Sequence, residues 1–177
     1  MRLANRLWRF FFLGIFIVAW GMVGSAQVSS YSSLSDKIAS LQDELLTKVI
    51  LRLSGKVVAV PATKTAQGIV GLWHPKSRTI YIFMNENLAY EDYKEILRHE
   101  AVHMAQYCNG LNQASAAPIP IGAIVGDSAQ ASYSLGRQKG LYGDAQSVLE
   151  AEAYTLESGS DQDVISLLEL LCINLKK

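Results

Sequence analysis

The chain has 177 residues, of which 50% are hydrophobic and 18% are charged. This length and apolar content suffice for one compact domain with its own core, and they exclude a chain that is disordered over most of its length. Sixteen basic side chains balance sixteen acidic ones, so binding to nucleic acid through its phosphates is not expected. Two cysteines, Cys108 and Cys172, are too few for a disulfide-rich scaffold and lack the spacing of a zinc knuckle or a CxxC redox motif.

The first 26 residues have the pattern of a secretory signal peptide. Arg2, Arg6 and Arg9 precede an apolar run at 10–23, and small residues follow at 24–26. The run is shorter than the roughly 20 residues of a membrane-spanning helix, which favours cleavage after Ala26 over retention as an anchor. We therefore expect an exported protein, secreted, periplasmic or in another compartment outside the cytoplasm, that contacts a membrane only if this segment is retained.

Residues 27–55 are predicted to form a serine-rich linker followed by one amphipathic helix. Apolar residues recur at helical spacing, at positions 34, 38, 41, 45, 49 and 53, and Gly55 ends the pattern. The domain proper is expected to span residues 56–177. Its first part holds three short β-branched segments, 57–60, 69–73 and 79–83, bounded by turn-forming residues. They predict a small, mostly antiparallel sheet with at least one hairpin.

The rest of the chain is predicted to be largely helical. A helix over about 90–109 ends at Gly110, a residue suited to a left-handed C-cap. Its apolar stripe consists of Leu97, Ala101, Ala105 or Met104, and Cys108. Helices are also expected over 127–137, 144–158 and 161–175, the last with a capping box of Ser160 and Asp163. The predicted fold class is α+β, with the sheet packed on a central helix and further helices at the C-terminus.

The segment from His99 to His103 has the sequence His-Glu-x-x-His on the predicted central helix. Histidines four residues apart lie above one another on one helix face, so both imidazoles can bind one metal ion. Zn²⁺ suits imidazole nitrogen, and a catalytic zinc site has three protein ligands and an open position for water. Glu100, on a neighbouring face, can take a proton from such a water. A third ligand is available in Glu150-Ala151-Glu152-Ala153-Tyr154, on a separate predicted helix.

These motifs resemble those of the small, single-domain zincin metallopeptidases of the gluzincin type. Carried over residue by residue, the resemblance makes His99 and His103 zinc ligands, Glu100 the general base and Glu150 the third ligand. It implies a zincin-like fold in which the sheet offers an edge strand to a peptide or protein substrate. It also implies hydrolysis of peptide bonds by metal-activated water. The resemblance covers about ten residues of one helix and about five of another.

The chain departs from the family pattern at Tyr154, where an aspartate that orients a ligand histidine often stands. Glu152 is an alternative third ligand. It lies about 200° around the helix from Glu150, so only one of the two carboxylates can face the metal. No residue is singled out to stabilise an oxyanion; the candidates are Tyr133, Tyr142, Tyr154 and His74.

Two alternatives to a peptidase are open. A zincin-like protein that keeps zinc without catalysis would be a binding or assembly module, and the departure at Tyr154 favours it somewhat. A carboxylate-bridged di-iron protein would need a second Glu-x-x-His element and an all-helical bundle, and the sequence predicts neither.

The pairing of the two cysteines is also open. Cys108 lies on the apolar stripe of the predicted central helix, and Cys172 follows apolar residues at helical spacing on the last one. Both are expected to face the core. A bridge between them and two buried free thiols are equally compatible with the sequence, because it does not fix the distance between their Cα atoms.

Overall fold

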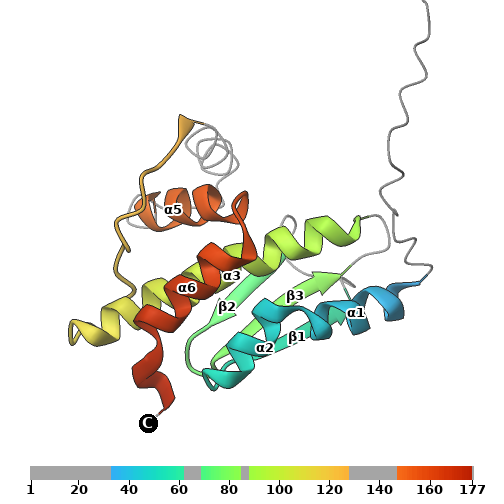
Figure 1. The fold of residues 1–177 in the computed structure, drawn as a ribbon, viewed down its shortest axis with the longest axis horizontal. Helices are drawn as coiled ribbons and strands as arrows, with labels where there is room; N and C mark the ends of the chain where they lie inside the picture. Colours follow the sequence, from blue (N-terminus) through green and yellow to red (C-terminus); the bar gives the residue numbers. More distant parts are fainter. Residues whose placement is uncertain (1–32, 62–68, 85–87, 128–146, 177) are drawn as a thin grey trace, which may run out of the picture. The chain divides into compact units, whose positions relative to one another are not determined.

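The computed structural model describes residues 33–61, 69–84, 88–127 and 147–176. Residues 31–177 form one compact unit of the α+β class (Figure 1). The predicted signal peptide and nearly all of the linker lie outside the described residues, as do 128–137 and 144–146 of the predicted helices. Within the described ranges, no helix combines the length and the apolar content needed to cross a membrane.

Two helices precede the sheet, where the apolar spacing predicts one. Helix α1 spans Leu34–Asp43 and α2 spans Leu45–Arg52, with Glu44 between them in an extended conformation (φ −58°, ψ 142°). The hydroxyl of Thr47 donates to the carbonyl of Leu41 at 2.8 Å, and the hydroxyl of Tyr90 donates to Glu44 at 2.7 Å. The prediction of one continuous helix is therefore wrong, because side-chain hydrogen bonds stabilise a break that the periodicity does not reveal.

The sheet has three strands, β1 (Lys56–Pro61), β2 (Gly71–His74) and β3 (Thr79–Met84), in the order β1–β3–β2. Strands β2 and β3 form the predicted antiparallel hairpin, whereas β1 runs parallel to β3. The sheet is thus mixed, and the prediction of a mostly antiparallel sheet is wrong. A tight turn forces two strands to be antiparallel, but the longer connection over 62–70 leaves the direction and neighbour of β1 undetermined by sequence.

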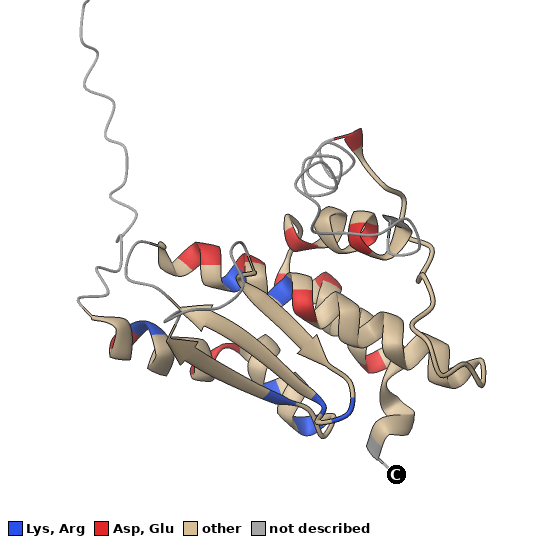
Figure 2. Cartoon of the chain, turned by 180° about the vertical axis from the view of Figure 1, so that it is seen from behind, with Lys and Arg blue, Asp and Glu red and all other residues tan. Residues whose placement is uncertain are grey.

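One face of the sheet packs against the helices and builds the core. The side chains that point to it are buried, namely Val57, Trp73, Ile80, Ile82 and Met84. They meet α2 and the central helix α3, which spans Tyr90–Asn112. Figure 2 shows the opposite face of the sheet.

Helix α3 carries the predicted apolar stripe, since Leu97, Ala101, Ala105 and Cys108 are all buried. It continues past the predicted end, and Gly110 lies inside the helix. That glycine is required for a close approach, because a Cβ there would lie 2.1 Å from the carbonyl oxygen of Ala117. The left-handed residue after the helix is Ala114 (φ 56°), so the prediction of Gly110 as the left-handed C-cap is wrong.

Two C-terminal helices, α5 (Ser147–Glu157) and α6 (Asp161–Leu171), pack on α3 (Figure 1). The capping box predicted at the start of α6 is confirmed. The hydroxyl of Ser160 accepts from the backbone N–H of Asp163 at 3.2 Å, and the carboxylate of Asp163 accepts from the N–H of Ser160 at 3.2 Å. Helix α6 is shorter than predicted and is followed by a 3-10 turn, η2 (Ile173–Lys176).

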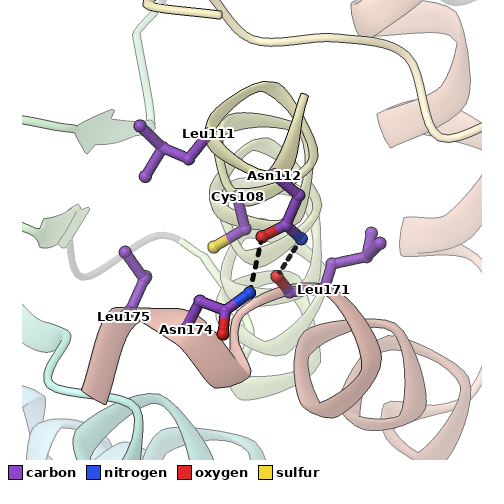
Figure 3. Close-up of a pocket in the computed structure, with 6 residues that line it drawn as sticks. All are labelled: Cys108, Leu111, Asn112, Leu171, Asn174 and Leu175. Carbon is purple, nitrogen blue, oxygen red and sulfur yellow. Dashed lines mark hydrogen bonds between the residues drawn. The ribbon is translucent and has the colours of Figure 1, made fainter. Parts of the chain in front are cut away.

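Cys108 and Cys172 form a disulfide with an S–S distance of 2.03 Å, which settles the open choice in favour of the bridge. Both cysteines are buried, and the bridge joins α3 to the end of α6. A pocket of about 320 Å³ lies beside it (Figure 3). Its rim is held by two hydrogen bonds of Asn112, which donates to the carbonyl of Leu171 at 2.7 Å and accepts from Asn174 at 3.0 Å.

Candidate metal centre

Helices α3 and α5 bring the three predicted ligands together. The Nε2 atoms of His99 and His103 lie 3.2 Å apart on one face of α3. Glu150 stands in the first turn of α5, and its carboxylate oxygens lie 3.3 Å from Nε2 of His99 and 3.5 Å from Nε2 of His103. His99 and Glu150 are buried, and His103 is half-buried. Their ligand atoms converge on a common point, as a metal site requires.

The proton positions on His103 follow from the orientation of Gln106. The amide nitrogen of Gln106 donates to the carbonyl of Leu149 at 2.9 Å and to the carboxylate of Glu152 at 3.0 Å. Its amide oxygen therefore faces Nδ1 of His103, at 2.8 Å. Because an oxygen acceptor faces Nδ1, this nitrogen carries the proton, and Nε2 of a neutral His103 presents a lone pair.

His99 is oriented in the same way by a carboxylate. Its Nδ1 lies 2.8 Å from the side chain of Glu157, the last residue of α5, and therefore carries a proton. Nε2 of a neutral His99 is then an acceptor that faces two other acceptors, Nε2 of His103 and the carboxylate of Glu150. The three side chains present lone pairs to one another and together attract a cation.

The pKa values of the group reflect this attraction. Burial lowers the pKa of His99, but hydrogen bonds to Glu150 and Glu157 outweigh the burial and raise it to about 10. Burial raises the pKa of Glu150, but hydrogen bonds to His103 and His99 outweigh it and lower the pKa to about 2. Oε2 of Glu150 is nevertheless buried without a hydrogen-bond partner among the described residues. The acceptors around Nε2 of His99 therefore favour a positive charge on this ring, and Oε2 of Glu150 lies 3.3 Å from that nitrogen.

Glu100 lies between the two histidines in sequence and turns toward β2. Its Oε2 accepts the backbone N–H of Trp73 at 2.6 Å. Gly71 makes room for the carboxylate, because a Cβ at that position would lie 2.6 Å from Oε1 of Glu100. Burial raises the pKa of Glu100, against the opposing effect of the two neighbouring histidines. A carboxylate with a raised pKa is suited to exchange a proton near neutral pH.

Helix α5 is fixed along α3 at both ends. Near its C-terminus, the guanidinium of Arg98 donates to the carbonyl of Glu157 at 2.5 Å. Near its N-terminus, Gln106 donates to the carbonyl of Leu149. The earlier residue of α3 contacts the later residue of α5, so the two helices are antiparallel. These contacts hold Glu150 opposite the histidines.

The other candidate for the third ligand, Glu152, faces away from the histidines. Its buried carboxylate accepts three consecutive backbone N–H groups, those of Ile121, Gly122 and Ala123, at 2.9, 2.7 and 3.0 Å. Gly122 has a positive φ of 82°, a conformation that favours glycine. Glu152 thus fastens the segment after α3 to α5, and of the two glutamates the structure brings only Glu150 to the histidines.

Of the candidates for stabilising an oxyanion, Tyr154 lies nearest to the ligands among the described residues. Its ring packs edge-on against the ring of His99, with 4.9 Å between the centroids. His74 is the last residue of β2 and is exposed, and its Nδ1 lies 2.8 Å from the hydroxyl of Ser77 in the turn that follows. Tyr133 and Tyr142 lie outside the described residues.

Two residues that orient the histidines were not predicted, Gln106 and Glu157. Gln106 follows His103 by three residues, which places both on one helix face. Glu157 follows Glu150 by seven residues, two helical turns, which also places both on one face. Spacing from the predicted ligands could therefore have identified both of them.

No protein-family model matches the chain, and comparison with curated proteins and with solved structures finds no match. The inference about function therefore depends on the geometry and chemistry of this group. The group consists of three side chains with converging lone pairs, an orienting partner on each histidine, and the carboxylate of Glu100, which is held beside them by a strand.

Proposed function

We propose that the protein is an exported, zinc-dependent peptidase with His99, His103 and Glu150 as the zinc ligands. The observation that carries the proposal is the spacing of the ligand atoms. Zinc bonds of about 2.0–2.1 Å at tetrahedral angles hold neighbouring ligand atoms roughly 3.3 Å apart. The two Nε2 atoms lie 3.2 Å apart, Oε2 of Glu150 lies 3.3 Å from Nε2 of His99, and Oε1 of Glu150 lies 3.5 Å from Nε2 of His103. One ligand atom from each of the three side chains lies within 4.8 Å of the other two.

The donor set also supports zinc. Two imidazole nitrogens and one carboxylate are a common set for a catalytic zinc ion, which keeps its fourth position open. Each histidine donates its second ring N–H to a fixed acceptor, as zinc-binding histidines usually do. The unsatisfied Oε2 of Glu150 would gain a partner in the metal.

Peptide hydrolysis is the reaction that the neighbouring groups support. Bound zinc lowers the pKa of a water toward about 7 and polarises a carbonyl. Glu100 would take the proton of the attacking water and return it to the leaving amine. The hydrogen bond from the N–H of Trp73 keeps the carboxylate of Glu100 in place for this transfer.

Strand β2 supports a peptide as the substrate. It is an edge strand, hydrogen-bonded only to β3 within the described sheet. The N–H of Phe83 on β3 donates to the carbonyl of Val70, and hydrogen-bonded pairs alternate along an antiparallel ladder. The backbone groups of Gly71 and the carbonyl of Trp73 therefore point outward, where an extended peptide can pair with them, while the N–H of Trp73 donates to Glu100.

Metal analysis tests the zinc proposal directly. The chain from Gln27 would be purified as the wild type, Glu100→Gln and Glu150→Ala, with Glu95→Gln as the control on the exposed side of α3. We expect about one zinc per chain in the wild type, the control and Glu100→Gln, and a strongly weakened site in Glu150→Ala. Absence of zinc from the metal-replete wild type would show that the histidines are structural and that the proposal is wrong.

A peptide library tests the catalytic part. Wild-type protein should cleave members of the library, and Glu100→Gln should lose at least about 10²-fold in rate while it keeps its zinc. Tyr154→Phe tests whether the hydroxyl of Tyr154 contributes to oxyanion stabilisation, and a loss there should fall on kcat. Zinc without cleavage of any peptide would favour the alternative of a noncatalytic binding or assembly module.

A further inference from the structure

The side of the sheet that faces away from the helices has an apolar surface. Strand register places these side chains in two rows across the sheet. In the first row Tyr81 is paired with Val58 on one side and Leu72 on the other. In the second row Phe83 is paired with Val60, and its N–H donates to the carbonyl of Val70. Alternation along a strand puts all of these on the side opposite the buried residues. We call this surface the open face; it consists of Val58, Val60, Val70, Leu72, Tyr81 and Phe83.

Three residues of the open face are exposed, and the other three, Val60, Tyr81 and Phe83, are half-buried. Val58 retains 38% of its accessible surface, and Val70 and Leu72 retain 44% each. In Figure 2 the three strands lie in front, and no described helix crosses them. Contiguous apolar surface of this kind, bordered by polar residues, marks a site of interaction with another molecule.

Basic residues lie at one end of the open face. The next row of the sheet holds Lys56 and His74, both exposed, on either side of Thr79. Lys76 is exposed in the β2–β3 turn, and Arg78 follows it, half-buried, with its guanidinium donating to the carbonyl of Leu175 at 3.1 Å. Figure 2 shows basic residues together at this end of the strands. Residues 45–84 contain six lysines and arginines and no aspartate or glutamate. All sixteen acidic residues of the chain lie outside this stretch, which comprises α2, the three strands and their connections.

We propose that the open face docks on the surface of an anionic lipid bilayer. Apolar side chains beside the exposed lysines Lys56 and Lys76 match the boundary between acyl chains and headgroups. There the apolar side chains are buried among acyl chains and the ammonium groups meet phosphates. Tyr81, with an apolar ring and a polar tip, is of the residue type enriched at that boundary. A second copy of the chain fits less well, because this sheet brings no acidic side chain to its cations.

Docking in this way leaves the candidate metal centre free. The open face points away from α3, whereas the ligands lie between α3 and α5. Membrane binding therefore requires neither zinc nor Glu100. This proposal and the proposed peptidase function can fail independently of each other.

The test uses the chain from Gln27, which keeps every described element and lacks the apolar segment at 10–23 that would partition into lipid by itself. Co-sedimentation would be measured with vesicles of phosphatidylcholine alone and with about one third phosphatidylglycerol. We expect binding only to the anionic vesicles, and weaker binding as salt is raised. The paired variant Lys56→Gln/Lys76→Gln should lose roughly 25-fold in affinity, since each cation near such a surface contributes about fivefold.

A second variant tests the apolar part. Val58→Ser/Leu72→Ser changes two exposed side chains and should weaken vesicle binding about tenfold or more, because binding scales with the apolar area buried. The matched controls are Leu170→Ser, on the exposed side of α6, and Lys48→Gln, on α2; both should bind as the wild type does. Circular dichroism and intact disulfide content would show that each variant is folded.

Three outcomes would overturn the proposal. The first is no binding to anionic vesicles at low salt. The second is equal binding by the wild type and both paired variants. The third is a wild-type dimer in analytical ultracentrifugation that Val58→Ser/Leu72→Ser converts to a monomer, which would identify the open face as an interface between copies of this chain.

Discussion

Nδ1 of His99 lies 2.8 Å from the carboxylate of Glu157, at the opposite end of α5 from Glu150. In the zincin pattern an aspartate four residues after the ligand glutamate often orients a histidine, and Tyr154 stands at that position here. Glu157 provides a carboxylate to His99 from about one helical turn further along α5. The ring of Tyr154 packs against the ring of the same histidine. The departure at Tyr154 therefore does not deprive His99 of an acidic partner.

We expect Glu157→Ala to weaken zinc binding about 10- to 100-fold, because the ring of His99 loses the acceptor that fixes its orientation. Glu157→Gln should lose less, since an amide oxygen can still accept the Nδ1–H. Zinc affinity would be measured by competition with a chromophoric chelator, with Glu95→Ala as the control. Unchanged affinity in Glu157→Ala would show that Glu157 does not position the ligand.

The parts of the fold that were predicted correctly depend on contacts within short stretches of sequence. The β2–β3 hairpin follows from a turn between two strand-like segments, and the capping box of α6 follows from Ser160 and Asp163 alone. The break at Glu44 depends on the hydroxyl of Tyr90, which is distant in sequence. The parallel pairing of β1 likewise depends on how the whole sheet assembles. Sequence periodicity reveals neither the helix break at Glu44 nor the parallel pairing of β1.

The candidate site likewise combines features set by local sequence with features set by the assembled fold. The spacing of His99 and His103 places both on one helix face whatever the rest of the chain does. The partnership between His99 and Glu157 exists only because Arg98 and Gln106 hold α5 antiparallel to α3. Partners of this kind require knowledge of how two helices cross. The convergence of His99, His103 and Glu150 could be predicted from the sequence. Spacing alone places Gln106 and Glu157 on the same helix faces as these residues, but the crossing of the two helices is needed to assign Glu157 to His99.

Gly71 is predicted to be necessary for catalysis but not for zinc binding. A Cβ at this position would lie 2.6 Å from Oε1 of Glu100 and 2.7 Å from Cγ2 of Ile96, so Gly71→Ala should displace both side chains, including the carboxylate that would act as the base. Misplacement by about 1 Å can cost about 10²-fold in rate, and we expect a loss of that size in kcat/KM on a cleaved peptide. Zinc content should not change.

Gly126→Ala is the matched control for this substitution, because a Cβ at Gly126 meets no atom within 4 Å. Its activity and zinc content should equal those of the wild type. Full activity of Gly71→Ala would show that catalysis does not depend on the position of the Glu100 carboxylate against β2. That result would count against Glu100 as the general base.

The disulfide between Cys108 and Cys172 should stabilise the fold substantially. The bridge closes a loop with a sequence separation of 64 residues. Loop-closure entropy for that length corresponds to about 4 kcal/mol. Cys108→Ala/Cys172→Ala should therefore unfold at a Tm lower by about 10 °C. Urea titrations would measure the free energy of unfolding, and a reductant should destabilise the wild type but not the double variant. A change below about 1 kcal/mol would contradict the prediction.

The stability of the metal-free protein should depend on pH through the ligand residues. The pKa of His99 is raised from 6.5 to about 10 in the folded chain, so its contribution to stability is complete below pH 6.5 and is lost as the pH rises toward 10. The pKa of Glu150 is lowered from 4.5 to about 2, so its contribution is complete above pH 4.5 and is lost as the pH falls toward 2. Together the two residues stabilise the metal-free fold most between these limits, from pH 4.5 to 6.5.

Urea unfolding in the presence of a chelator would measure this dependence at about pH 6 and about pH 9, on the wild type and on His99→Gln. The free energy of unfolding should fall between the two pH values more for the wild type than for the variant, because only the wild type loses a stabilising proton from His99. If zinc binds as proposed, it would take the place of that proton, and the zinc-loaded wild type should show no such fall. Equal slopes for the metal-free wild type and His99→Gln would show that His99 is not protonated in the folded chain and that the acceptors around it do not attract a cation.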